Sequence, residues 1–113
     1  MALTNLYGPH DVFREDRSHV VAAVIKKIAD ARLGLTGAPQ LWGTGTPKRE
    51  FAYVEDAAAV IADGLNWPTD FEPVNLNGEE VTIRNLVELV AELVGYKGPI
   101  NWNPDKPDGV MRK

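Results

Sequence analysis

The chain has 113 residues, of which 44% are hydrophobic and 25% are charged, and its formal net charge is −4 at pH 7. This length suits a single domain, and the composition is typical of a globular protein. The negative charge argues against nucleic-acid binding, which uses a basic face, and no apolar run is long enough to span a membrane. The chain has no cysteine and two histidines, which fits a cytoplasmic protein and argues against a structural metal site.

The N-terminal part of the chain predicts a strand followed by a helix. The strand covers residues 2–7 (ALTNLY) and ends at Gly8 and Pro9, because these residues interrupt regular structure. Ser18 is placed to cap a helix over residues 19–33. The apolar side chains of that helix recur with a period of 3.6 residues, so one of its faces is expected to be buried.

The rest of the chain continues to alternate strands and helices. Further short strands are predicted at residues 40–42, 49–54, 73–77 and 99–102. A helix starts at Glu55, after the second of these strands, and runs to about residue 66. The clearest helix covers residues 82–94, with Thr82 as its N-terminal cap and Gly95 at its C-terminal end. The alternation predicts the α/β class, but the strands are too short and scattered for an independent sheet.

The motifs of a complete dinucleotide-binding oxidoreductase are missing from this sequence. No G-x-G-x-x-G follows a strand, because GTGTPK at residues 43–48 has no third glycine. The acid/base pair Tyr-x-x-x-Lys is also missing, because the residues four positions after the three tyrosines are Asp11, Ala57 and Ile100. The sequence therefore contains neither a phosphate-binding loop nor the catalytic pair of short-chain dehydrogenases.

Several segments, taken in order, resemble the C-terminal half of the GDP-L-fucose synthase family. They are NLYGPHD with SHV (residues 5–11 and 18–20), WGTGTPKREF (42–51), TIRNLVELV with LVGYKG (82–98) and KPDG-x-x-RK (106–113). This family consists of NADPH-dependent 3,5-epimerase/4-reductases of GDP-4-keto-6-deoxymannose, within the extended short-chain dehydrogenase/reductase superfamily. The resemblance covers nearly the whole chain, and both the order and the spacing of the segments agree.

The resemblance implies a single domain over residues 1–113 with part of the extended short-chain dehydrogenase/reductase fold. This part is the C-terminal, substrate-binding portion, without the N-terminal Rossmann half that carries the glycine-rich loop and the Tyr-x-x-x-Lys pair. NADP is then a cofactor of the complete enzyme, and the chain alone is expected to bind none. The partner is the nucleotide-diphosphate sugar, and no metal is implied.

On the cofactor side, the resemblance implies contacts from the strand residues Leu3, Thr4, Asn5 and Leu6. His19 matches a family histidine near the nicotinamide, where an imidazole can move a proton at a carbon beside a ketone. Two plainer interpretations stay open. The strand can be buried without touching a cofactor, and the histidine can stand at a helix N-terminus without a catalytic role.

On the substrate side, the resemblance implies contacts from Lys27, Trp42, Arg49 and Asp108. Arg49 offers a planar fork that suits a diphosphate, Lys27 offers a point charge, and Trp42 can stack on guanine or on a sugar. Asp108 can accept hydrogen bonds from ribose or sugar hydroxyls. The alternatives are a solvated lysine, a core tryptophan, and an aspartate that only forms the Pro-Asp-Gly turn.

The predicted function is therefore the GDP-sugar-binding portion of an epimerase/reductase, inactive by itself. One alternative is a portion of another extended NAD(P)-dependent sugar epimerase or dehydratase, and a second is a non-catalytic fragment that self-associates. The bare strand edges and the apolar face of the helix at residues 82–94 predict a homodimer, or association with a missing N-terminal half.

Overall fold

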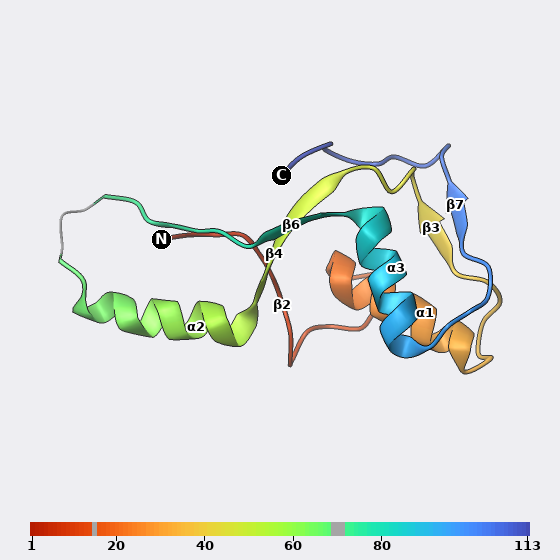
Figure 1. Ribbon diagram of the computed structural model, residues 1–113, viewed down its shortest axis with the longest axis horizontal. Coiled ribbons are helices and arrows are strands. Elements are labelled where there is room, and N and C mark those ends of the chain that lie inside the picture. Colours follow the sequence, from red (N-terminus) through yellow and green to blue (C-terminus); the bar gives the residue numbers. More distant parts are fainter. Residues whose placement is uncertain (15, 69–71) are drawn as a thin grey trace.

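The computed structural model describes residues 1–14, 16–68 and 72–113, and it has the expected α/β composition (Figure 1). The molecule is elongated, with extents of 52 × 27 × 24 Å and a radius of gyration of 16.4 Å. A compact domain of this length would have a radius of gyration of about 13 Å. The shape arises because helix α2 (Val54–Asp63) extends to one end of the molecule, away from the other two helices (Figure 1).

A central sheet joins the two ends of the molecule. Its strands are β2 (Asn5–Tyr7), β4 (Lys48–Tyr53) and β6 (Glu79–Thr82). Strand β4 pairs in parallel with β2 and antiparallel with β6, so that Phe51 lies between Asn5 and Glu79. The sequence does not predict β6, because its adjacent glutamates belong to a residue type that is depleted in strands.

Two further pairs of strands flank the central sheet. Strand β1 (Ala2–Leu3) is parallel to β5 (Asn75–Leu76), and strand β3 (Gln40–Trp42) is parallel to β7 (Asn101–Asn103). The prediction of one strand at residues 2–7 is therefore wrong, because Thr4 separates β1 from β2 and the two strands pair with different partners. The strands predicted near β5 and β7 are present with different bounds.

Helix α3 (Ile83–Val94) has both of the caps that the sequence predicts. The hydroxyl oxygen of Thr82 accepts a hydrogen bond of 3.1 Å from the backbone N–H of Asn85. Gly95 ends the helix in the left-handed region, with a φ of 80°. These signals are local, so the sequence is sufficient to locate them.

The cap predicted at Ser18 is wrong. Helix α1 (Val20–Arg32) begins after His19 and has no side-chain cap, while the Ser18 hydroxyl donates a hydrogen bond to the carbonyl of Arg14. Serine side chains often bond to a backbone carbonyl a few residues earlier, and that bond competes with capping. A short 3-10 helix at Gly64–Asn66 follows α2, so the helix predicted from Glu55 to about residue 66 is correct in extent, but its last three residues are a 3-10 helix.

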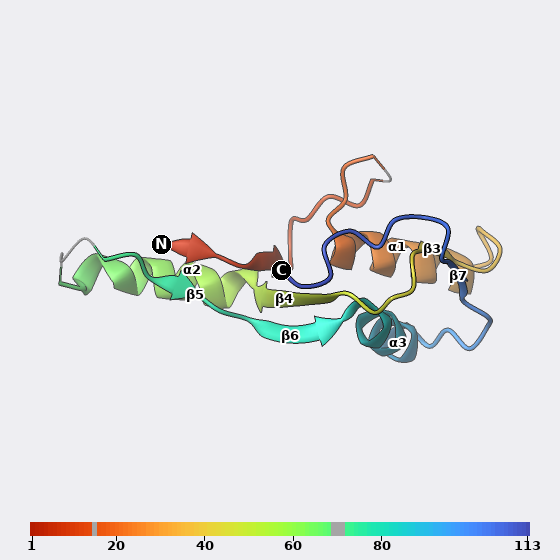
Figure 2. The same cartoon turned by 90° about the horizontal axis from the view of Figure 1, so that it is seen from above.

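The hydrophobic core lies where α1 and α3 pack side by side (Figures 1 and 2). Its buried members are Val21, Val24, Ile28, Leu41, Phe51, Leu86, Val87, Val90 and Ala91. The apolar face of α3 is thus largely covered by α1 of the same chain, contrary to the expectation that it needs another surface. Leu93 is the exception on that face, with 78% of the residue exposed.

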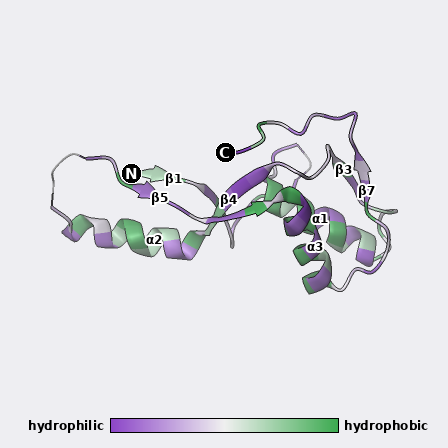
Figure 3. Cartoon of the chain, turned by 45° about the horizontal axis from the view of Figure 1, so that its top comes forward, coloured by the Kyte–Doolittle hydropathy of each residue, from purple (hydrophilic) through white to green (hydrophobic). Residues whose placement is uncertain are grey.

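Helix α2 has much less cover than the other helices. Of its own residues, Ala57 alone is buried, while Ile61 is 46% exposed and Leu65, just beyond the helix, is 89% exposed. Figure 3 shows hydrophobic residues along this helix. Within the described part of the chain, no helix combines the length and the apolar character needed to cross a membrane.

Candidate functional site

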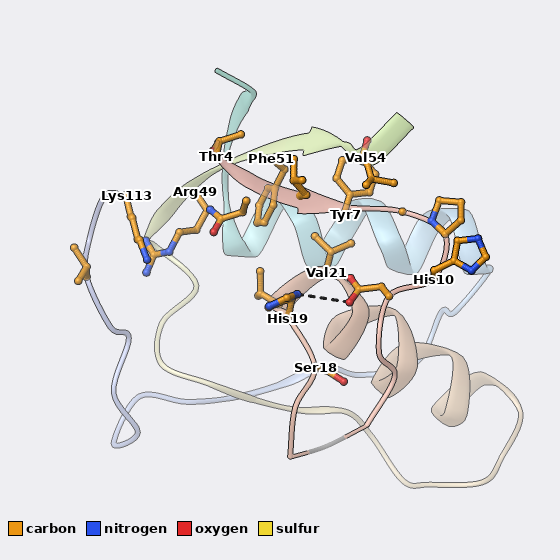
Figure 4. A pocket seen from close by; sticks show the side chains of 17 residues that line it. Thr4, Tyr7, His10, Ser18, His19, Val21, Arg49, Phe51, Val54 and Lys113 are labelled. Carbon is orange, nitrogen blue, oxygen red and sulfur yellow. Dashed lines mark ion pairs between the residues drawn. The ribbon is translucent and has the colours of Figure 1, made fainter. Parts of the chain in front are cut away.

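A cleft of about 850 Å³ lies beside strand β2 and the start of α1 (Figure 4). We call it the histidine pocket, and its walls include Thr4, Asn5, Leu6, Asp11, His19 and Arg49. The structure therefore brings His19 together with three of the four strand residues that the sequence places on the cofactor side. The fourth, Leu3, lies in β1 opposite Leu76 and lines a neighbouring cavity of about 330 Å³, which Thr4 and Asn5 line as well.

The polar residues at the start of β2 are engaged with the neighbouring strand. The Thr4 hydroxyl and the Asn5 side-chain amide each donate a hydrogen bond of 3.0 Å to the carbonyl of Glu50. These hydrogen bonds connect the start of β2 to β4, so Thr4 and Asn5 both stabilise the sheet. Leu6, which is half-buried, contributes an apolar part of the pocket wall.

His19 is the N-cap residue of α1, and its side chain is 81% exposed. Its Nδ1 is 3.6 Å from Oδ1 of Asp11, whose side chain is 12% exposed, and Figure 4 marks this pair with a dashed line. An imidazole in an open cleft can serve as a general acid or base toward a bound ligand. The geometry is therefore compatible with the acid/base role predicted for His19.

A second cavity, of about 340 Å³, lies between α1, β3 and the tail that follows β7. We call it the tryptophan pocket, because Trp42 and Trp102 both line it. All the residues predicted to contact the substrate line this one cavity, namely Lys27, Trp42, Arg49 and Asp108. Arg49 and Val20 line the histidine pocket as well, so the two cavities are neighbours.

The cations and the exposed ring of the tryptophan pocket have partners within the chain. Lys27 Nζ donates a hydrogen bond of 2.8 Å to the carbonyl of Gln40, and Arg49 Nη1 donates one of 2.7 Å to the carbonyl of the preceding residue. Trp42 is 63% exposed, and Lys106 Nζ lies 5.6 Å from the centre of its ring. Because these contacts use one donor of each cation, the pocket keeps positive charge and an aromatic surface for a ligand.

Asp108 has a structural task in the tryptophan pocket. Its Oδ1 accepts a hydrogen bond of 2.6 Å from the backbone N–H of Thr44, and its Oδ2 accepts one of 2.8 Å from the Thr44 hydroxyl. These bonds hold the pKa of the Asp108 carboxyl below its ordinary value, against the opposing effect of burial. A side chain at Gly43, whose φ is 75°, would overlap this carboxylate, so the turn requires glycine. Asp108 thus holds a residue far away in the chain, which is different both from the sugar contact and from the local Pro-Asp-Gly turn considered from the sequence.

Trp102, which lines the tryptophan pocket, is in contact with Arg84, and neither residue is among the site residues predicted from the sequence. The guanidinium carbon of Arg84 lies 4.7 Å from the centre of the Trp102 ring, and Arg84 Nη2 donates a hydrogen bond of 2.6 Å to the carbonyl of Thr44. Arg84 lies in the segment TIRNLVELV, but nothing in that segment indicates its contact with Trp102, because α3 and β7 approach the turn only in the folded chain. Among residues 1–14, 16–68 and 72–113, no three His, Asp or Glu side chains are grouped to hold a metal ion.

The family model for the NAD dependent epimerase/dehydratase family matches residues 1–76, which is more than half of the chain. The chain therefore belongs to the NAD-dependent epimerase/dehydratase family. Its α/β fold agrees with that class.

Individual enzymes of known name are similar to almost the whole chain. It is 44% identical to GDP-L-fucose synthase 1 of Arabidopsis thaliana over 111 residues, which are 97% of this chain and 34% of the relative. It is 40% identical to GDP-L-colitose synthase of Yersinia pseudotuberculosis over 112 residues, which are 96% of this chain and 36% of the relative. The chain thus spans about a third of the length of these relatives.

A solved structure supports the same resemblance. The GDP-L-fucose synthetase of Naegleria fowleri bound to NADP superposes with a TM-score of 0.90 at 28% sequence identity. The superposition covers 98% of this chain and 35% of the other. The arrangement of the described elements is therefore that of part of an NADP-binding relative.

Proposed function

We propose that this chain supplies the GDP-sugar-binding surface of an NADP-dependent epimerase/reductase similar to GDP-L-fucose synthase. In this proposal the chain corresponds to the C-terminal, substrate-binding portion of the enzyme. The observation that carries the proposal is the position of Arg49, which lines both the histidine pocket and the tryptophan pocket. A diphosphate bound at Arg49 would direct its nucleoside toward Trp42 and its sugar toward His19.

Each pocket supplies a different part of the chemistry. In the tryptophan pocket, Lys27 and Arg49 offset the charge of the diphosphate, and the exposed ring of Trp42 offers a surface for a base. In the histidine pocket, His19 exchanges protons with the carbons beside the sugar ketone. Two such carbons are inverted in a 3,5-epimerisation, and the ketone between them is then reduced.

The described residues fit the nicotinamide end of NADP but not its pyrophosphate. Leu6 offers an apolar wall and His19 a polar group for a nicotinamide ring, whereas Thr4 and Asn5 already bond to β4. The sequence has no glycine-rich loop to hold a pyrophosphate. When bound in the complete enzyme, NADPH supplies the hydride for the reduction. We assign NADP to that enzyme and expect this chain by itself to hold it poorly.

Calorimetry with GDP on the purified chain tests the proposal. We expect weak binding, with a Kd of about 10 μM to 1 mM, because the chain has the contacts of one pocket and not a complete, preorganised site. Arg49→Ala should weaken the binding by roughly tenfold to a hundredfold, since a charge-assisted hydrogen bond contributes about 1.5–3 kcal/mol. UDP in place of GDP reports whether the pocket distinguishes the base.

The matched control is Arg17→Ala, which removes the same charge from an exposed side chain that pairs with Asp16. This variant should bind GDP as the unaltered chain does. If GDP fails to bind at millimolar concentration, or if Arg49→Ala and Arg17→Ala bind alike, the proposed site is wrong.

A second candidate function is a related sugar-nucleotide epimerase or reductase with a different sugar. The 40% identity to GDP-L-colitose synthase favours keeping this candidate, because that relative is nearly as similar as the fucose synthases. Both candidates predict binding of GDP at Arg49. Titration with GDP-mannose and GDP-fucose, compared with GDP alone, would show how much the sugar contributes.

A further inference from the structure

We propose that Asp11 is the positioning residue for His19: its carboxylate keeps the proton of the neutral imidazole on Nδ1 and leaves Nε2 free to exchange a proton in the histidine pocket. The proposal rests on the proposed function for the identity of the sugar that meets Nε2. Which nitrogen of His19 carries the proton depends only on Asp11 and His19.

The carboxylate of Asp11 has a backbone partner in the turn that follows β2. Its Oδ1 accepts a hydrogen bond of 2.7 Å from the backbone N–H of Val12, and the backbone N–H of Asp11 lies 3.4 Å from the carbonyl of Gly8. The Asp11 side chain is 12% exposed, whereas the His19 side chain is 81% exposed. The carboxylate of Asp11 is therefore largely buried, and it lies beside a His19 ring that is mostly exposed to solvent.

The atoms that face each other determine the effect on the ring. An ionised carboxylate can only accept hydrogen bonds, and Nδ1 is the ring nitrogen that lies 3.6 Å from Oδ1 of Asp11. This separation is longer than a hydrogen bond, and catalytic pairs without a bound substrate are often longer than in the working complex. A small rotation of the ring brings Nδ1–H to the carboxylate. Nε2 then carries the lone pair that takes a proton from a carbon acid.

A simpler role for Asp11 predicts something different. As a turn former only, Asp11 would hold the N–H of Val12, and its charge would have no influence on the ring of His19. Asp11→Asn separates the two roles. The amide oxygen of asparagine can still accept the turn bond, and in that position it also faces Nδ1. The negative charge is lost, so the amide oxygen is a weaker acceptor for Nδ1–H than the carboxylate.

The test is NMR of the imidazole nitrogens in the ¹⁵N-labelled chain at about pH 8, where an ordinary imidazole is neutral. The two histidines of the chain are His10 and His19, so His10 is the reference within the same sample. We expect Nδ1 of His19 to resonate as a protonated nitrogen and Nε2 as an unprotonated one, in contrast to His10. In Asp11→Asn this contrast should become clearly smaller. Asp16→Asn, which removes a carboxylate that pairs with Arg14 and Arg17, should preserve it.

Two outcomes would overturn the proposal. One is a wild-type chain in which His19 and His10 have the same distribution of the proton between their nitrogens, a result that needs no variant and no assumption about folding. The other is an Asp11→Asn chain with a dispersed amide spectrum and an unchanged His19. Failure of GDP to bind would refute the proposed function and leave this result intact, so the two failures are distinguishable.

Discussion

Asp108 receives two hydrogen bonds from Thr44, a residue that lies 64 positions earlier in the chain. The contact fastens the tail after β7 to the turn between β3 and β4, beside the tryptophan pocket. Further along, the backbone N–H of Lys48 donates a hydrogen bond of 2.8 Å to the carbonyl of Met111. Figures 1 and 2 show the tail running from β7 back toward β4. One carboxylate thus helps to place a wall of the proposed nucleotide site.

The attachment of the tail should depend on acid pH. The pKa of Asp108 is lowered in the folded chain, so its carboxylate stabilises the fold above the ordinary aspartate value of about 4 and loses this effect as the pH falls through the folded pKa. We expect the amide proton of Thr44 to shift upfield when the carboxylate is protonated, because its acceptor weakens. Two-dimensional NMR between about pH 6 and pH 2 would measure this transition.

Substitution at Asp108 should reproduce the effect at neutral pH. Asp108→Ala removes both acceptors, so we expect faster proteolysis of the tail after residue 104 and weaker binding of GDP in the adjacent pocket. Asp105→Ala is the matched control, since this exposed aspartate lies in the same tail. Equal proteolysis of the two variants would show that the contact with Thr44 does not hold the tail.

The two leucines Leu86 and Leu93 of α3 should respond very differently to the same substitution. Leu86 is 9% exposed and packs in the core, whereas Leu93 is 78% exposed. Leu86→Ala should lower the free energy of unfolding by about 2–5 kcal/mol, because it removes buried methyl groups and leaves a cavity. Leu93→Ala should change it by less than about 0.5 kcal/mol. Urea unfolding followed by circular dichroism measures both, and similar losses would mean that Leu93 is covered in solution.

We expect the chain to form a homodimer through the sparsely covered side of α2. Ile61 is 46% exposed and Leu65 is 89% exposed, and apolar patches of this kind favour association. Ile61→Lys with Leu65→Lys should weaken the dimer by at least about tenfold, since each buried aliphatic side chain contributes roughly 1.5–3 kcal/mol. Sedimentation equilibrium at micromolar concentration measures this. Leu35→Lys, at a 70% exposed position beyond α1, is the control. A monomer with cooperative melting would refute the expectation.

The purified chain is expected to show no epimerase or reductase activity. Its sequence lacks the glycine-rich loop and the Tyr-x-x-x-Lys pair, so neither a hydride donor nor its proton partner is held. Oxidation of NADPH in the presence of GDP-4-keto-6-deoxymannose is the measurement, with the GDP-L-fucose synthase of Arabidopsis thaliana as the positive control. Turnover by the chain above the rate without protein would contradict this prediction.

The features that the sequence predicts correctly are those with local causes. The caps of α3 at Thr82 and Gly95 depend on bonds between residues a few positions apart, and the period of α1 and α3 reflects the geometry of one helix. The sequence does not predict strand β6, because its glutamates do not favour a strand. Its pairing with β4 joins segments that are far apart in the sequence. The break at Thr4 has the same cause, because β1 and β2 take different partners.

In the candidate site, too, some features follow from the sequence and others only from the tertiary structure. The segments SHV, REF and KPDG contain His19, Arg49 and Asp108, which their resemblance to a family indicates as site residues, and the same resemblance indicates Lys27 by its position. Only the tertiary structure decided that Leu3 lines a neighbouring cavity, that Arg49 lines both pockets and that Asp108 bonds to Thr44. The sequence determines which chemical groups are available and where helices begin and end, because these depend on neighbours along the chain. Which groups meet depends on the packing of α1, α3 and β4, and that packing joins residues far apart in the sequence.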